Sequence, residues 1–126
     1  MVSVDTNILI RIITRDDAEQ ARRADAFIGR GAWVSHLVLA ETVWVLTKSY
    51  GRTTRQLAET IEVLLAHEHL RLEEPNVVES ALAAFKNRPA IGFSDYLIFE
   101  IARKAGHTPL GTFDRNLAKL DGVEKI

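Results

Sequence analysis

The sequence predicts a three-layer α/β/α fold in which a parallel sheet lies between two layers of helices. Short, apolar, often β-branched segments alternate with amphipathic helical patterns along the whole 126-residue chain. This alternation is typical of parallel sheets, because each crossover between parallel strands needs room for a helix. The length fits one domain, residues 1–126, and the 47% of hydrophobic residues suffice for its core.

Short strands are expected to alternate with helical segments from one end of the chain to the other, with one or two helices between successive strands. Five segments have the short apolar character of strands: 1–4, 32–34, 70–72, 109–112 and 123–126. Helical patterns fill the intervals: 8–13, 16–28, 36–50, 54–67, 75–86, 95–105 and 115–120. A parallel five-stranded sheet would use all five strands.

Polar residues with capping character mark where the helices begin. Asp16 and Glu19 have the spacing of a capping box, and Ser35 precedes the helix over 36–50. Thr53 or Thr54 opens the next helix, and Ser94 is the expected cap of the helix that Gly106 ends.

The composition excludes several classes of protein. The absence of cysteine excludes disulfide scaffolds, zinc ribbons and cysteine nucleophiles. Apolar runs such as 37–40 are too short to cross a bilayer, and residues 1–8 lack the pattern of a signal peptide. We therefore expect a soluble cytoplasmic protein with no membrane partner. The net charge of −1 neither supports nor excludes a polyanionic partner.

Two aspartates follow predicted strands. Asp5 comes directly after the strand over 1–4, and Asp114 follows the strand over 109–112. Ligands of parallel sheets bind beyond the carboxyl ends of the strands, so these side chains are candidates for a functional site. An ordinary helix N-cap is the alternative for each.

Two further acids lie on apolar helix faces. The residues three and four positions from Glu41 are all apolar: Leu37, Val38, Trp44 and Val45. Asp95 likewise shares its face with Ile98, Phe99 and Ala102. Both carboxylates are expected to point inward, where an unpaired charge is costly. A salt bridge to Glu41 and a helix-dipole interaction of Asp95 are the alternatives.

Four convergent carboxylates favour a metal site. Like charges in one cleft repel one another unless protons or cations neutralise them. Mg²⁺ and Mn²⁺ prefer oxygen ligands, and a hydrated ion of this kind activates water for phosphodiester hydrolysis. The acids therefore indicate a metal-dependent hydrolase.

The motifs around these acids resemble those of the PIN domain family, and most closely its VapC-type ribonuclease toxins. The motifs are Val4-Asp5-Thr6-Asn7, Ala40-Glu41, Ser94-Asp95-Tyr96 and Thr112-Phe113-Asp114. The resemblance implies a parallel five-stranded sheet and a pocket in which Asp5, Glu41, Asp95 and Asp114 hold Mg²⁺ or Mn²⁺. It also implies cleavage of single-stranded or looped RNA, homodimers, and inhibition by a cognate VapB-like antitoxin that blocks the pocket.

One position departs from the pattern of some relatives. Asn116 stands where they carry a further acid, so the choice between one and two ions stays open.

Other polar residues near the motifs are candidates for supporting roles. Thr6, Asn7, Ser94 and Thr112 are expected to orient carboxylates or water, although each also suits a cap or a turn. Phosphate contacts are expected from Arg11, Arg15, Arg88 and Arg115, each of which has a simple solvated position as its alternative. Trp33, Trp44 and Phe99 are expected in the core, whereas Phe93 and Tyr96 are candidate exposed aromatics.

Three other functions are alternatives to the metal-dependent ribonuclease. A catalytically inactive PIN module that binds RNA or protein is the main alternative, although such modules tend to lose pocket acids. A metal-free ribonuclease needs two convergent imidazoles, and His67 and His69 are expected to face different ways. A phospho-acceptor domain would have adjacent acids after the first strand, where only Asp5 is present.

Overall fold

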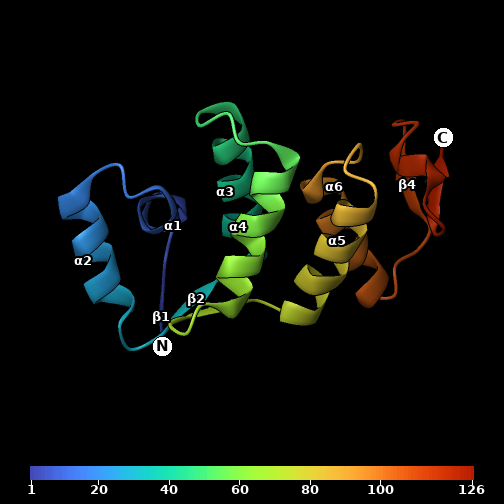
Figure 1. The fold of residues 1–126 in the computed structure, drawn as a ribbon. Coiled ribbons are helices and arrows are strands. Elements are labelled where there is room, and N and C mark those ends of the chain that lie inside the picture. Colours follow the sequence, from blue (N-terminus) through green and yellow to red (C-terminus); the bar gives the residue numbers. More distant parts are fainter. The chain divides into compact units, whose positions relative to one another are not determined.

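The computed structural model describes the whole chain, Met1–Ile126, which divides into two compact units (Figure 1). The first unit comprises Met1–Pro75 and the second Asn76–Ile126. That the two units form the single domain of residues 1–126 remains a prediction. No helix has the length and apolar character that crossing a membrane would require.

The first unit contains a three-stranded parallel sheet and four helices. In chain order its elements are β1 (Val2–Ser3), α1 (Thr6–Thr14), α2 (Ala18–Ile28), β2 (Ala32–Val34), α3 (His36–Lys48), α4 (Thr54–Ala66) and β3 (Leu70–Leu72). The strands lie in the order β1-β2-β3, with Val2 beside Ala32 and Ala32 beside Leu70. Helix α1 packs against α2 and α3, and α4 packs against β3.

The two faces of this sheet differ in burial. Ala32, Val34, Leu70 and Leu72 are buried, as predicted for strands of an α/β core. Trp33 lies beside Arg71 in the register and both are exposed, so the expectation of Trp33 in the core is wrong. Alternation along β2 and β3 causes this, because successive side chains of a strand point to opposite faces. That helices cover both faces of the sheet remains a prediction.

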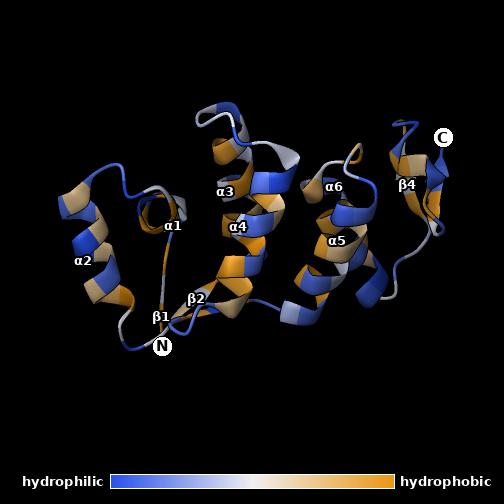
Figure 2. Ribbon diagram, viewed as in Figure 1, coloured by the Kyte–Doolittle hydropathy of each residue, from blue (hydrophilic) through white to orange (hydrophobic).

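The second unit contains two helices and a pair of parallel strands. Its elements are α5 (Pro75–Asn87), which begins at the boundary, α6 (Phe93–Lys104), β4 (Leu110–Thr112), the 3₁₀ turn η1 (Leu117–Lys119) and β5 (Val123–Lys125). Strand β4 pairs with β5 in parallel register. In Figure 2 the helix α5 shows alternating apolar and polar positions, as expected of an amphipathic helix.

Aromatic residues form the centre of the second unit. The rings of Phe85 and Phe93 meet edge to face with centroids 6.0 Å apart. Tyr96 is buried, and its hydroxyl donates a hydrogen bond of 2.7 Å to the carbonyl of Arg88. The expectation that Phe93 and Tyr96 are exposed is therefore wrong. Both belong to the face of α6 that is buried within this unit.

The strands form sheets of three and two members, rather than the single five-stranded sheet that we expected. All pairings are parallel, as predicted. Each strand is only two or three residues long, so each pairing rests on few backbone hydrogen bonds. Strand β4 makes its bonds with β5, which follows it after a turn of ten residues (113–122). Sequence patterns gave the strand positions but not this pairing.

Some predicted caps are confirmed and others are shifted by one or two residues. Ser35 accepts a hydrogen bond from the amide of Val38, and Thr53 begins α4 with a capping box. Helix α2 begins at Asp17 instead of Asp16. Helix α6 begins after Gly92 without a side-chain cap, so Ser94 lies inside the helix and does not cap it.

Two buried threonines provide a test of packing in the first unit. The Thr42 hydroxyl is fully buried and has no hydrogen-bond partner, whereas that of Thr60 donates to the carbonyl of Gln56 and accepts from Arg52. We expect Thr42→Val to raise the free energy of unfolding by about 1 kcal/mol, because it removes an unpaired buried hydroxyl. Thr60→Val is expected to lower it by about 1 kcal/mol. Urea denaturation measures both, and a destabilised Thr42→Val would contradict this account.

Candidate acidic site

Asp5 lies at the junction between β1 and α1. Its backbone is extended, with φ −94° and ψ −179°, and its Oδ1 accepts a 3.0 Å hydrogen bond from the amide of Ile8. The side chain is therefore the N-cap of α1, as the alternative interpretation predicted. Its second oxygen, Oδ2, has no partner within the protein, so capping leaves one carboxylate oxygen available for another ligand.

Glu41 lies near Asp5. Both line a cavity of about 200 Å³ together with Thr6, Asn7 and part of the first turn of α3. Within the first unit the structure thus brings together two of the four predicted acids and two of the predicted supporting residues. Thr6 is buried, whereas Asn7 is exposed. This arrangement fits a small site at the carboxyl end of β1.

The expectation that Glu41 points inward is wrong. Glu41 is exposed, and so are two of the apolar neighbours that suggested burial, Leu37 at 78% and Trp44 at 58%. The buried face of α3 instead carries Leu39, Thr42, Val43 and Leu46. Because α3 has apolar residues on more than one face, apolar neighbours did not identify its buried side. Trp44 is also not the core residue that we expected.

Glu73 holds the beginning of α3, and sequence reasoning did not identify it as a site residue. Its Oε1 accepts a 2.8 Å hydrogen bond from the backbone amide of His36 and lies 3.7 Å from the His36 ring nitrogen Nδ1. A carboxylate at a helix N-terminus satisfies free amides and stabilises the helix dipole. Glu73 thereby ties the end of β3 to the helix that carries Glu41. Its position directly after a predicted strand, like that of Asp5, was the available signal.

Asp95 and Asp114 both lie in the second unit, where the charge of Asp114 acts on Asp95. Asp95 is half-buried in the first turn of α6, and burial raises its pKa, with a further contribution from the negative charge of Asp114. Asp114 is exposed, and its Oδ1 accepts hydrogen bonds from the amides of Asn116 and Leu117. Thr112 accepts a bond from the amide of Asp114 and so helps to orient it.

The donor set fits a hard divalent cation. Each unit has its own pair of carboxylates, and the predicted supporting residues near each pair carry only oxygen and amide groups. Within neither unit do three metal-binding side chains come together. Mg²⁺ is usually held by one or two carboxylates and completes its coordination with water, so a pair is an adequate protein contribution. The repulsion between Asp95 and Asp114 is the kind that a bound cation relieves.

The predicted basic residues have different surroundings. Arg11 donates to Gln20 at 2.6 Å and pairs with Asp16 at 3.2 Å, and Arg15 pairs with Asp25 at 2.6 Å. These two guanidinium groups connect parts of the first unit and are not free for phosphate. Arg88 and Arg115 are exposed, and their predicted contacts with RNA remain predictions.

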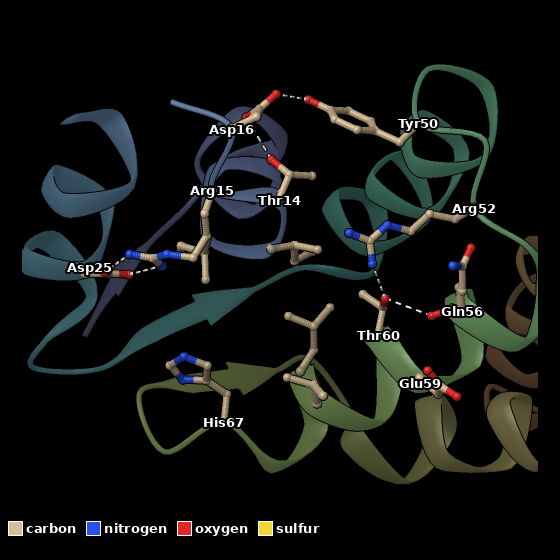
Figure 3. A pocket seen from close by; sticks show the side chains of 14 residues that line it. Thr14, Arg15, Asp16, Asp25, Tyr50, Arg52, Gln56, Glu59, Thr60 and His67 are labelled. Atoms are coloured by element: carbon tan, nitrogen blue, oxygen red, sulfur yellow. Dashed lines mark hydrogen bonds and ion pairs between the residues drawn. The ribbon is translucent and has the colours of Figure 1, made fainter. Parts of the chain in front are cut away.

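A larger cavity of about 730 Å³ contains none of the four acids (Figure 3). Several of its polar side chains are paired with one another, as Figure 3 shows for Arg15 with Asp25 and for Asp16 with Tyr50. These bonds lower the pKa of both aspartates: that of Asp16 mainly through the Tyr50 hydroxyl, and that of Asp25 mainly through Arg15. Mutual pairing of this kind leaves little free chemistry in the cavity.

The two neighbouring histidines lie closer together than we expected. The ring centroids of His67 and His69 are 5.9 Å apart, with the planes tilted by 58°. The Nδ1 atom of His67, however, accepts a hydrogen bond from the backbone amide of His69, and Nε2 of His69 lies 2.9 Å from Glu68. Local bonds therefore engage one nitrogen of each ring, and the pair adds no support for metal-free catalysis.

The parallel strands, the crossover helices and the carboxylates at strand ends define an α/β protein with an acidic site. A model of the PIN domain matches residues 2–123, so the chain belongs to the PIN domain family. A solved structure that it resembles is that of the VapC20 toxin of Mycobacterium tuberculosis, described as cleaving the sarcin-ricin loop. The two chains are 22% identical with a TM-score of 0.45, and the match covers 98% of each. No curated protein sequence matches the chain.

Substitutions at Asp5 separate its capping role from its charge. We expect Asp5→Asn to leave the free energy of unfolding nearly unchanged, because an asparagine oxygen also accepts the hydrogen bond from Ile8. Asp5→Ala is expected to lower it by about 1 kcal/mol through loss of the cap. Thermal or urea unfolding of both variants measures the difference. Equal stability of the two variants would mean that the hydrogen bond from Ile8 to the Asp5 side chain does not contribute to the free energy of unfolding.

Proposed function

We propose that this protein is a Mg²⁺- or Mn²⁺-dependent endoribonuclease, the VapC-type toxin of a toxin–antitoxin pair. The main support is that a member of the PIN domain family has Asp5 and Glu41 lining one cavity in its first unit. In the second unit, Asp95 and Asp114 interact through their negative charges. The proposal requires both pairs to serve the same metal-dependent reaction.

The chain's own residues have definable roles in this reaction. When bound, the metal ion would neutralise the carboxylates, lower the pKa of a coordinated water and stabilise negative charge on the phosphate. The proposed metal ligands are Asp5, through its free Oδ2, and Glu41 in the first unit, and Asp95 in the second unit with Asp114 acting directly or through water. Thr112 would keep Asp114 in place.

The overall chemistry is a hydrolysis. A water oxygen forms a bond to phosphorus while the bond to the three-prime oxygen breaks, and that oxygen takes up a proton. The products are a five-prime phosphate and a three-prime hydroxyl. Serine is not needed as a nucleophile, and Ser94 lies within α6 without the glycine-flanked turn that an activated serine requires.

The proposal also names the molecules that this protein binds and the compartment in which it acts. The substrate is RNA, a VapB-like antitoxin blocks the acidic site, and the toxin acts as a homodimer in the cytoplasm. The alternative is a catalytically inactive PIN module that binds RNA or protein. Retention of acids at all four motif positions favours the enzyme over this alternative.

Removal of the Asp5 charge tests the enzyme directly. With Mg²⁺ or Mn²⁺ present, we expect Asp5→Asn to reduce the rate of RNA cleavage by about a hundredfold or more, because the cap is retained while a metal ligand is weakened. Gel analysis of labelled RNA measures the rate. Asp17→Asn is the matched control, since Asp17 caps α2 in the same way but lies outside the acidic site.

Three results would contradict the proposal or a part of it. Equal cleavage by wild type and Asp5→Asn would refute the metal site at Asp5. Binding of RNA by the wild type without cleavage would favour the inactive module. Activity that persists after chelation of divalent ions would exclude the metal-dependent reaction.

Metal binding has a readout that is independent of catalysis. A ligand that binds only the folded state at a hundred times its dissociation constant adds about 2.7 kcal/mol of stability. We expect Mn²⁺ to raise the melting temperature of the wild type, and Asp95→Asn to lose most of this increase. Asp121→Asn, an exposed acid of the same unit, is expected to keep it. An unchanged increase in Asp95→Asn would show that Asp95 does not hold the ion.

A further inference from the structure

Two more cavities border Asp5, and both lie within the first unit. One, of about 590 Å³, is lined by Asp5, Ile8, Phe27, Trp33 and residues around the ends of β1 and β2. The other, of about 440 Å³, is lined by Asp5, Asn7, Ile8 and the α2 residues Gln20, Arg23, Ala24 and Phe27. Because Asp5, Ile8 and Phe27 line both, the two cavities are parts of one groove. This feature is called the Asp5 groove below.

Arg23 is the cation of the Asp5 groove, and it has no ion pair. Three other arginines of the α1–α2 region are paired, Arg11 with Asp16, Arg15 with Asp25 and Arg22 with Glu19. Arg23 is exposed, its side chain makes no hydrogen bond within the protein, and it lines the same cavity as Asp5. A guanidinium in this position is available to an anion, and its planar donors suit phosphate oxygens.

The Asp5 groove also presents aromatic rings. Phe27 lies one helical turn beyond Arg23 and is 52% exposed, and Trp33 is 39% exposed. Exposed aromatic rings beside a cation are the usual surface for single-stranded nucleic acid, since every base has a face that stacks on them. A base that stacks on a protein ring must be unpaired, so the groove suits unpaired RNA and not a duplex.

We propose that the Asp5 groove binds the RNA nucleotides next to the bond that is cut. Arg23 contacts a phosphate of this segment, and Phe27 and Trp33 stack on its unpaired bases. The inference rests on the proposed ribonuclease function, because it places these contacts beside Asp5. RNA is favoured over an acidic peptide because the groove joins one free guanidinium to two aromatic surfaces, which matches the alternation of phosphate and base.

Binding by the groove is measured in the Asp5→Asn background, which retains the N-cap while cleavage is suppressed. We expect Arg23→Ala to weaken the binding of a labelled single-stranded RNA by about tenfold and to reduce the slope of log K against log salt by about 0.7, the value for one lost phosphate contact. Arg22→Ala is the matched control and is expected to bind normally, because Arg22 pairs with Glu19 and does not line the groove. In the active protein, Arg23→Ala is expected to raise KM and leave kcat nearly unchanged.

Stacking is tested with paired and unpaired versions of the same RNA. We expect Phe27→Leu and Trp33→Leu each to weaken binding of the unpaired RNA by about tenfold, which is within the range for loss of one stacked base. With the same sequence held in a duplex, wild type and variants are expected to bind equally weakly. Melting curves of each variant confirm that it is folded before binding is measured.

The outcomes separate this inference from the function on which it rests. If the wild type cleaves RNA but Arg23→Ala and the two aromatic variants bind like the Asp5→Asn parent, the groove assignment is wrong and the nuclease stands. If the wild type neither binds nor cleaves any RNA, the proposed function itself fails. If the groove variants bind RNA normally but lose binding to a protein inhibitor, the groove is a protein-binding surface and the RNA inference is overturned.

Discussion

The hydrogen bond from the Ile8 amide to Asp5 decides how the first unit is built around its candidate site. Strand β1 has only two residues, and the chain must pass from extended backbone to helix within a few residues. An N-cap makes this passage possible, because its own backbone is extended while its side chain satisfies a free amide of the helix. The same bond fixes the carboxylate at the carboxyl end of β1. One oxygen is used for structure, and the other stays available for chemistry.

Comparable junctions follow other strands. Ser35 caps α3 directly after β2, Glu73 reaches the same helix from the end of β3, and Asp114 caps the turn after β4. Polar side chains collect at these points because helix N-termini need acceptors there. An acid at a strand end can therefore serve both as a structural acceptor for backbone amides and as a functional group. For Asp5 and Asp114 the hydrogen bonds from backbone amides are observed.

Sequence patterns predicted where strands and helix caps lie along the chain better than they predicted which side chains are in contact. The parallel strands, the cap at Ser35 and the start of α4 at Thr53 or Thr54 follow from local chemistry, and all are found. Predictions failed where the outcome depends on neighbouring elements. The exposure of Glu41 was missed because α3 is apolar on several faces, and only its packing against α1 and α4 selects the buried one. Arg11 and Arg23 look alike in the sequence, yet of the two only Arg11 forms an ion pair.

This difference between paired and unpaired charges also explains why the cavity lined by Arg15 and Asp25 is a weaker candidate for anion binding than the Asp5 groove. In the cavity of about 730 Å³ the Arg15 guanidinium already pairs with Asp25, so an incoming anion would have to share it with that carboxylate. Arg23 has no such partner to lose. A site is thus recognised by which of its polar groups are unsatisfied, and volume alone does not identify it. On this physical ground the surface beside Asp5 is the better place for a phosphate chain.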